Sequence, residues 1–583
     1  MRYRVRALVV SALAISLAVA GCSKNTGGGG NSGGGGPSKQ AAIVIDKDGS
    51  VGKAPAPDVP GAKKGGTLYW LEDGATEHLR PQQAYVTDAQ SVLSLMQRTL
   101  TNYIEDPNGG PLKLVGDLAT NAGESSNDSK TWTYHLRNGI KFEDGTPITS
   151  KDIAYGISSA FGKQGENGPE YVQQALDPDK AFKFQLGSAS SIVPGITTPD
   201  DKTIVFTTKD PHPEWPYLMA LNTTSPVPPA KDTGDAYERA WVSDGPYMQD
   251  GPYDGQTKLK LKKNPNWDPA SDPIRHQYPD NWVFDFSPNR NDQTKRLIAD
   301  QGADQYAVGT AQVAQANVSE VQNDANLSKR VASAPTPFND YVNINTSRVT
   351  DLKVRQALNY AFDRGAYITA LGGSALAAPS TTLEAPIVPG YQKYDAYPGQ
   401  GDHGDPAKAK ELLAGQKPKL KYCFANTQTQ QQYAVVIQQA MARADIQVVL
   451  APVDKSAYYT TIGDKTTDCD IMRYGWGADF PDAQSTLNVL FNGKNIVAKG
   501  NQNTCYFNQP DINQKLDDLQ KEPDRAVAAT KYGELDKEIM EKYAPTIPNF
   551  VLRAYILHGS KVGGGFISPL FANYNLVNLY AMS

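Results

Sequence analysis

The segment from residue 420 to residue 474 constrains the fold more than any other part of this sequence. Short apolar runs at residues 420–424 and 446–450 predict two buried strands. The residues between them predict a helix, because one face carries the apolar side chains Tyr433, Val436, Ile437, Ala440 and Met441. A strand–helix–strand order favours parallel strands joined by a crossover helix. We therefore expect an α/β protein, in which the apolar run at residues 470–474 joins the same sheet.

A loop rich in glycine and proline is expected after this third strand. Residues 473–482 read Arg-Tyr-Gly-Trp-Gly-Ala-Asp-Phe-Pro-Asp, which places aromatic rings, glycines and two acids close together. Loops that leave strand ends often form binding sites. This stretch alone is equally consistent with an ordinary turn whose acids face solvent, so the choice depends on the rest of the chain.

Length and charge narrow the class of protein. With 583 residues, the chain is expected to form two or three domains. Its 57 basic and 62 acidic residues give a net charge of −5, which argues against nucleic acid as a partner. The 30 tyrosines offer flat apolar area and a hydroxyl, which suits binding of small organic ligands.

The N-terminus predicts export and a lipid anchor. Arg2, Arg4 and Arg6 precede an apolar stretch at residues 7–20, which is shorter than the ~20 residues of a membrane span and is typical of a signal peptide. The following Val19-Ala20-Gly21-Cys22 resembles a bacterial lipobox, so we expect residues 1–21 to be removed and Cys22 to carry the lipid. A plain secretory signal with a chance cysteine is the alternative.

A flexible tether is expected between the lipid and the folded part. Residues 22–62 contain two runs of four glycines within a stretch rich in Gly, Ser, Asn and Lys. A flexible coil of ~40 residues spans about 35 Å on average. The folded body would then reorient beside the membrane without leaving it.

Several short motifs, in order along the chain, resemble a known family. They are found at residues 65–68 (Gly-Gly-Thr-Leu), 115–119, 136–147, 244–247, 345–346, 354–364 and 405–413. In this order they resemble the extracellular solute-binding proteins of family 5, the oligopeptide, dipeptide and nickel receptors of ABC importers. The resemblance extends over nearly everything from Gly65 to the C-terminus.

The same motifs also predict scaffold elements. From Asp351, residues Val354, Ala357, Leu358 and Ala361 follow helical spacing, and Asp405 with Pro406 has the order of a helix N-terminus. Residues 131–136 alternate as in a half-buried strand. After them, Thr149 or Ser150 is expected to cap a helix.

The resemblance implies a two-lobed fold of the periplasmic-binding-protein type (type II, large form) with the ligand enclosed between the lobes. The boundaries that it implies are residues 63–340 for lobe I with an extra subdomain at about 110–235, residues 341–554 for lobe II, and residues 555–583 for a return to lobe I.

The resemblance also implies a function. It predicts a monomeric lipoprotein on the extracytoplasmic face of the bacterial cell membrane, which captures short peptides and delivers them to a permease driven by an ATPase. The membrane is reached through the lipid alone, and neither a cofactor, a metal nor an enzymatic activity is expected. The peptide should bind as an extended strand, with main-chain hydrogen bonds supplying affinity.

Asp479 is the expected anchor for the ligand. Within residues 476–480 it matches the position at which peptide receptors of the family hold the ligand's α-ammonium group. The resemblance places Trp476, Gly477 and Tyr474 around it, and the loop at Tyr85 and Thr87 opposite. The alternative is that Asp479 caps its own loop.

The cysteines allow one disulfide besides the lipid on Cys22. Cys423, Cys469 and Cys505 remain, and Cys423 in its apolar strand is consistent with a buried thiol. The family resemblance favours a Cys469–Cys505 bridge near the ligand loop.

The sequence leaves two other functions open. A receptor for nickel, heme or an oligosaccharide on the same fold is the closer rival, because family membership does not specify the ligand. A secreted hydrolase is the more distant one. The sequence contains neither a G-x-S-x-G nor an H-E-x-x-H motif, and its 6 histidines are scattered, although a pair of catalytic carboxylates remains compatible with it.

Overall fold

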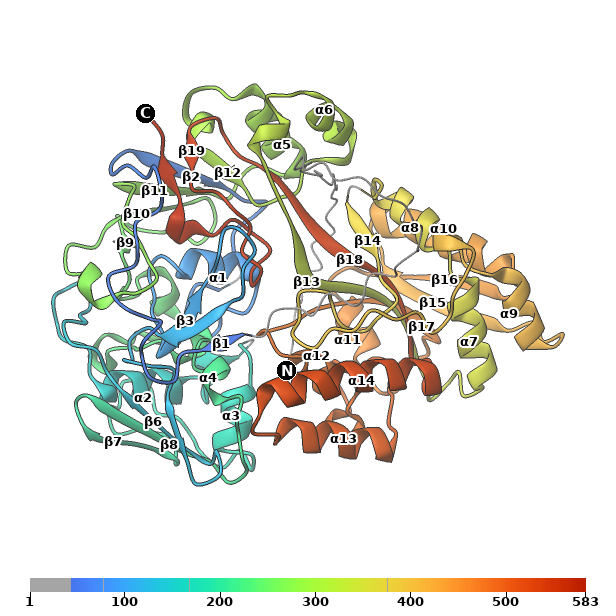
Figure 1. Cartoon of the computed structure of the whole chain (residues 1–583), viewed down its shortest axis with the longest axis horizontal. Coiled ribbons are helices and arrows are strands. Elements are labelled where there is room, and N and C mark those ends of the chain that lie inside the picture. The colour runs from blue at the N-terminus through green and yellow to red at the C-terminus, as the bar shows by residue number, and fades with distance from the viewer. Residues whose placement is uncertain (1–42, 77, 167, 375) are drawn as a thin grey trace, which may run out of the picture.

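Two large β-sheets, each surrounded by helices, form the two lobes of the chain (Figure 1). The computed structural model describes residues 43–76, 78–166, 168–374 and 376–583. The predicted signal peptide at residues 1–21 and the predicted lipidation site Cys22 lie outside these residues.

The sheet of lobe I has the strand order β12-β2-β11-β10-β9. β2 pairs in parallel with β11 and β12, and its Leu68 and Trp70 point into the buried core. The elements are β2 (Thr67–Leu71), β9 (Tyr247–Gln249), β10 (Lys258–Lys263), β11 (Asn281–Asp285), β12 (Ala307–Gly309), α1 (Thr87–Leu93), α5 (Arg290–Ala299) and α6 (Val318–Asn323).

Two smaller sheets lie within the first part of the chain. One has the order β5-β6-β8-β7 and the other β1-β4-β3. Trp132 and Tyr134 of β6 are buried, as the predicted alternation requires. These elements are β1 (Val44–Ile45), β3 (Thr101–Ile104), β4 (Lys113–Gly116), β5 (Glu124–Ser126), β6 (Thr131–His135), β7 (Ile196–Asp200), β8 (Thr203–Thr207), α2 (Ser150–Ser159), α3 (Tyr171–Leu176) and α4 (Trp215–Leu218).

The sheet of lobe II has the order β14-β18-β13-β17-β15-β16. β15 and β16 are parallel and joined by α10, and β17 pairs in parallel with β15, so the predicted strand–helix–strand unit is confirmed. The elements are β14 (Ala377–Pro379), β15 (Lys419–Ala425), β16 (Gln447–Val453), β17 (Ile471–Gly477), α7 (Leu352–Ala361), α8 (Arg364–Leu371), α9 (Pro406–Leu413), α10 (Gln428–Ala442), α11 (Tyr458–Ile462), α12 (Gln484–Phe491), α13 (Pro510–Gln520) and α14 (Arg525–Tyr543).

The loop predicted from residue 473 begins later than expected. β17 continues through Gly477, because β13 pairs with it along its whole length. β17 is an inner strand of the sheet, between β13 and β15. The loop therefore starts at Ala478.

Two long antiparallel strands connect the lobes. β13 (Val331–Ile344) and β18 (Thr546–Leu557) run side by side from one lobe to the other (Figure 1). Ala334 and Ala554 pack with the core of lobe I, whereas Tyr341 and Val551 pack with a core of lobe II. After β18 the chain remains with lobe I, where β19 (Val562–Gly563) pairs with β20 (Tyr580–Ala581).

The predicted helix starts are present. Thr149 and Asp152 form a reciprocal capping box at α2. The side chain of Asp351 accepts a hydrogen bond from the backbone N–H of Lys353, and that of Asp405 accepts one from Lys408. These caps satisfy backbone donors that a helix leaves unpaired at its N-terminus.

The tether prediction is wrong for residues 43–62, and its residues 22–42 lie outside the described part of the chain. Val44 and Ile45 form a strand that pairs with β4, and the buried carboxylate of Asp46 accepts the backbone N–H of Gly52 at 2.7 Å. The N–H of Ala56 donates to the carbonyl of Asp272. Residues 43–62 are therefore part of the folded body. Their composition did not indicate the strand pairing or the buried acid that hold them there.

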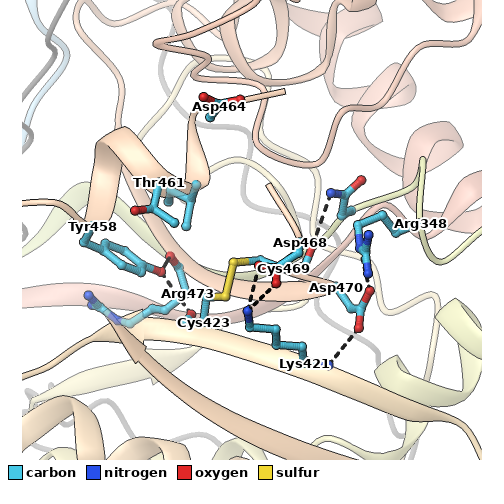
Figure 2. The surroundings of a disulfide bond; sticks show 12 residues. Arg348, Lys421, Cys423, Tyr458, Thr461, Asp464, Asp468, Cys469, Asp470 and Arg473 are labelled. Carbon is cyan, nitrogen blue, oxygen red and sulfur yellow. Dashed lines mark hydrogen bonds and ion pairs between the residues drawn. A yellow bond between two sulfur atoms is a disulfide. The ribbon is translucent and has the colours of Figure 1, made fainter. Parts of the chain in front are cut away.

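The disulfide joins Cys423 and Cys469, so the predicted Cys469–Cys505 bridge is wrong (Figure 2). β15 and β17 are neighbours, with Cys423 opposite Met472, and this pairing brings the two Cα atoms to 5.8 Å. Such a separation is suitable for a disulfide. Cys505 is a buried free thiol.

Candidate functional site

The loop after β17 reaches from lobe II to lobe I. Its Asp479 is half-buried and accepts hydrogen bonds from two tyrosines of the first part of the chain. The hydroxyl of Tyr85, just before α1, donates to Oδ1 at 2.8 Å, and the hydroxyl of Tyr171, at the start of α3, donates to Oδ2. Asp479 is therefore placed where the lobes meet, and its role as ligand anchor stays a prediction.

The environment of Asp479 disfavours its charged form. Burial raises its pKa from 3.8 to about 7, although the hydrogen bonds from Tyr171 and Tyr85 lower it. A carboxylate with this pKa gains stability from any cation that approaches it. The loop thus carries an acid whose charge is incompletely balanced by the protein.

Phe480 provides the apolar contact between the lobes. It is 2% exposed and belongs to the hydrophobic core of lobe I, although the chain around it belongs to lobe II. Its ring stacks on Tyr217 at 5.9 Å and meets the edge of Tyr171 at 5.3 Å. Aromatic pairs of this kind favour the closed arrangement of the lobes.

A second polar connection lies beside the aromatic one. Gln484 of α12 donates through Nε2 to Glu214 at 3.3 Å. Asp482 forms a buried ion pair with Arg525 at 2.6 Å and accepts the backbone N–H of Gln484. Asp482 therefore holds its own loop in place, whereas Asp479 faces the other lobe.

A cavity of about 70 Å³ lies against Asp479. Residues of α1, β3, the segment after α4 and residues 570–577 line it from lobe I, and Ala478, Asp479 and Phe480 close it from lobe II. Besides Asp479, the lining contains the carboxyl group of Glu105.

Trp476 and Tyr474 lie away from this cavity. Both are buried in a core of lobe II, with ring centroids 6.4 Å apart and nearly parallel planes. The indole N–H of Trp476 donates to the carbonyl of Ser485, and the hydroxyl of Tyr474 donates to Gln502. These contacts account for both residues as parts of the core of lobe II. Their contact with ligand stays a prediction.

Gly477 and Thr87 also have structural explanations. A Cβ on Gly477 would lie 2.2 Å from the ring of Phe338, so a side chain does not fit there. Thr87 is the first residue of α1, and its carbonyl accepts the hydroxyl of Ser91. Neither residue lines the cavity, and their proposed role in ligand contact remains a prediction.

Sequence reasoning missed Tyr171, Tyr217 and Glu105. Each lies in the first half of the chain, far from residue 479, and none stands in a motif that indicates binding. Only the folding of the two lobes against each other brings them to Asp479. The neighbouring Phe480 was within the predicted loop but was not singled out.

Residues 43–76, 78–166, 168–374 and 376–583 contain no group of three or more His, Cys, Asp or Glu side chains that could hold a metal ion. In the same part of the chain, no helix is long and apolar enough to cross a membrane.

Comparisons with known proteins agree with this architecture. The model of the bacterial extracellular solute-binding proteins, family 5, middle region, matches residues 113–497. The solved structure of clavulanic acid biosynthesis oligopeptide binding protein 2 is 27% identical with a TM-score of 0.84, covering 93% of this chain and 99% of that protein. Helicobacter pylori DppA in complex with the peptide STSA is 20% identical with a TM-score of 0.68, covering 89% of this chain and 99% of DppA.

Sequence relatives show the same similarity. The probable D,D-dipeptide-binding periplasmic protein DdpA of Escherichia coli K12 is 23% identical over 466 residues, which are 76% of this chain and 81% of DdpA. The oligopeptide-binding protein OppA of Bacillus subtilis 168 is 24% identical over 438 residues, which are 71% of this chain and 75% of OppA.

Proposed function

Because the chain belongs to family 5 of the bacterial extracellular solute-binding proteins, we propose that it captures short peptides outside the cytoplasmic membrane and delivers them to an ABC permease. The family consists of binding proteins, not enzymes, and this chain is an extracytoplasmic receptor of that kind. The peptide as ligand is supported by relatives named for oligopeptides and by DppA, whose structure contains a bound peptide.

The observation that carries the proposal is the position of Asp479. Its carboxylate extends from lobe II toward lobe I and borders the cavity. A free N-terminus is the one positive charge that every peptide carries at a fixed place, so a receptor that accepts many side chains can use it to set the register. A charge-assisted hydrogen bond to this group contributes ~1.5–3 kcal/mol.

Closure of the lobes completes the proposed site. Phe480 packs between Tyr171 and Tyr217, so the closed form brings Asp479 and its tyrosine partners together. Closure also excludes water, which strengthens the polar contacts made inside. The peptide would bind in the cleft as an extended strand, through main-chain hydrogen bonds.

The anchor and the transport partners complete the proposal. Lipid on Cys22 holds the protein at the membrane surface, with two or three acyl chains contributing ~0.8 kcal/mol per buried CH₂. The permease and its cytoplasmic ATPase recognise the closed, loaded form and supply the energy for import.

The test is to identify the ligand that co-purifies with the protein. Denaturation followed by mass spectrometry should release intact short peptides, and their addition to the emptied protein should reduce its radius of gyration in small-angle scattering. Recovery of nickel, heme or an oligosaccharide in place of peptides would overturn the peptide assignment. Cleavage of the released peptide by the protein would contradict a purely binding function.

A further inference from the structure

The cavity beside Asp479 is lined by polar side chains whose hydrogen-bonding capacity the described part of the chain does not fill. Glu105 accepts the hydroxyl of Ser568 through Oε1 at 3.0 Å, while its Oε2 has no hydrogen-bond partner among the described residues. Gln97 is 3% exposed and donates through Nε2 to the carbonyl of Val242, which leaves Oε1 as an acceptor without a described partner. The hydroxyl of Tyr103, which also lines the cavity, likewise has no hydrogen-bond partner among the described residues.

The charges around the cavity are predominantly negative. Among the lining residues that the structure describes, Arg275 is the one basic side chain. Its guanidinium is already paired with Asp117 at 2.8 Å and with Asp272 at 3.2 Å. Glu105, in contrast, has no ion-pair partner among the described residues, and burial raises its pKa to about 7 against the lowering effect of Asn575 and Ser568. The cavity thus offers an acid to a positively charged group.

We propose that this cavity is a specificity pocket for a cationic side chain, lysine or arginine, at the first residue of the bound peptide, with Glu105 as its ion-pair partner. The inference rests on the proposed function, because it requires Asp479 to hold the peptide's α-ammonium group. Ala478, Asp479 and Phe480 form one wall of the cavity, so the side chain nearest to the anchored N-terminus enters it. Gln97 and Tyr103 accept the remaining donors of the cation.

The dimensions and the walls of the cavity suit such a side chain. At about 10–15 Å³ for each water-sized group, a volume of about 70 Å³ holds roughly five to seven non-hydrogen atoms. The side chains of lysine and arginine are of this size. Tyr217 and Phe480 also line the cavity, and their rings provide apolar surface for the aliphatic stem and a favourable face for a cation.

The experiment compares tetrapeptides that differ at one position. Isothermal titration calorimetry would measure the Kd of the full mature protein for peptides that begin with lysine, arginine or the uncharged norleucine, each followed by three alanines. The wild-type protein should bind the lysine and arginine peptides at least about ten-fold more tightly than the norleucine peptide. In a second series, lysine moved to the second or third position should lose this advantage.

Two variants connect the preference to Glu105. Glu105→Gln keeps the shape of the side chain and an acceptor for Ser568, so the ratio of its Kd for the norleucine peptide to its Kd for the lysine peptide should fall to about one. Glu384→Gln is the matched control: Glu384 is a buried glutamate of lobe II, 1% exposed, that does not line the cavity. This variant should keep the preference.

The outcomes separate this inference from the proposed function. Equal affinity of the wild type for all three peptides would overturn the cationic pocket while leaving peptide binding intact. A preference for lysine at another position, or one that persists in Glu105→Gln, would also overturn it. Failure of every peptide to bind would instead refute the proposed function. The wild-type series needs no variant, so it decides the question even if Glu105→Gln does not fold.

Discussion

Asp479→Asn should weaken peptide binding strongly, while it changes the stability of the ligand-free folded protein only slightly. The substitution removes the negative charge that we assign to the α-ammonium group but keeps the size of the side chain. The lost charge-assisted hydrogen bond is worth ~1.5–3 kcal/mol, which corresponds to an increase in Kd of about 10- to 150-fold. Tyr85 still has an oxygen to which it can donate, so the contact between the lobes persists.

The stability of the ligand-free protein should behave differently. Because the pKa of Asp479 rises from 3.8 in the unfolded chain to about 7 in the folded protein, the folded protein holds a proton that the unfolded chain releases between these pH values. The contribution of Asp479 to the free energy of unfolding is fully present below about pH 4 and is lost as the pH rises through about 7. Asparagine removes this dependence, so the Tm of Asp479→Asn should equal or exceed that of the wild type at pH 8.

Affinity should depend on pH in the opposite sense, since the ammonium group binds the carboxylate. At pH 5.5, with a pKa of about 7, only about 3% of Asp479 is ionised, and the wild type should bind about 30-fold more weakly than at pH 8. The variant should show little of this loss.

The assay is calorimetry at pH 8 and pH 5.5 with a tetrapeptide and its N-acetylated form. Acetylation should weaken binding to the wild type about as much as the substitution does, and should add little in Asp479→Asn. Asp482→Asn is the control, because Asp482 pairs with Arg525 inside lobe II and should lower the Tm. If the wild type and Asp479→Asn bound both peptides equally well, Asp479 would not be the anchor.

Three further predictions test the architecture. Phe480→Ala removes on the order of 3 kcal/mol of packing from the closed form, so scattering should show a larger radius of gyration for the ligand-free protein; an unchanged radius would mean that Phe480 does not hold the lobes. Replacing both Cys423 and Cys469 by alanine should cost up to about 4 kcal/mol of stability, from the entropy of closing a loop across the 46-residue separation. Alkylation of the denatured, unreduced protein should label Cys505, and labelling of Cys423 instead would restore the rejected pairing. Cys22→Ser should release the protein from the membrane or leave an uncleaved precursor, and a processed variant that remained acylated and bound would contradict the lipid anchor.

The sequence alone determined the local elements. Asp405 was identified as a helix cap, and apolar periodicity identified the helix after Asp351 and the helix around Tyr433, because caps and amphipathic faces depend on residues within a few turns of one another. The parallel pairing of β15 and β16 also followed from their order along the chain. The same local reasoning located Asp479 in a loop after a buried strand, although it placed the start of that loop too early.

Tertiary structure decided which distant residues meet. Tyr85 and Tyr171 precede Asp479 by 394 and 308 positions, and Cys423 precedes Cys469 by 46. No local pattern records such contacts, since they arise from sheet order and from the packing of one lobe on the other. For the same reason only the structure places Trp476 in a core of lobe II, where its contact with ligand stays a prediction, and only the structure places the acid of Glu105 on the wall of the cavity.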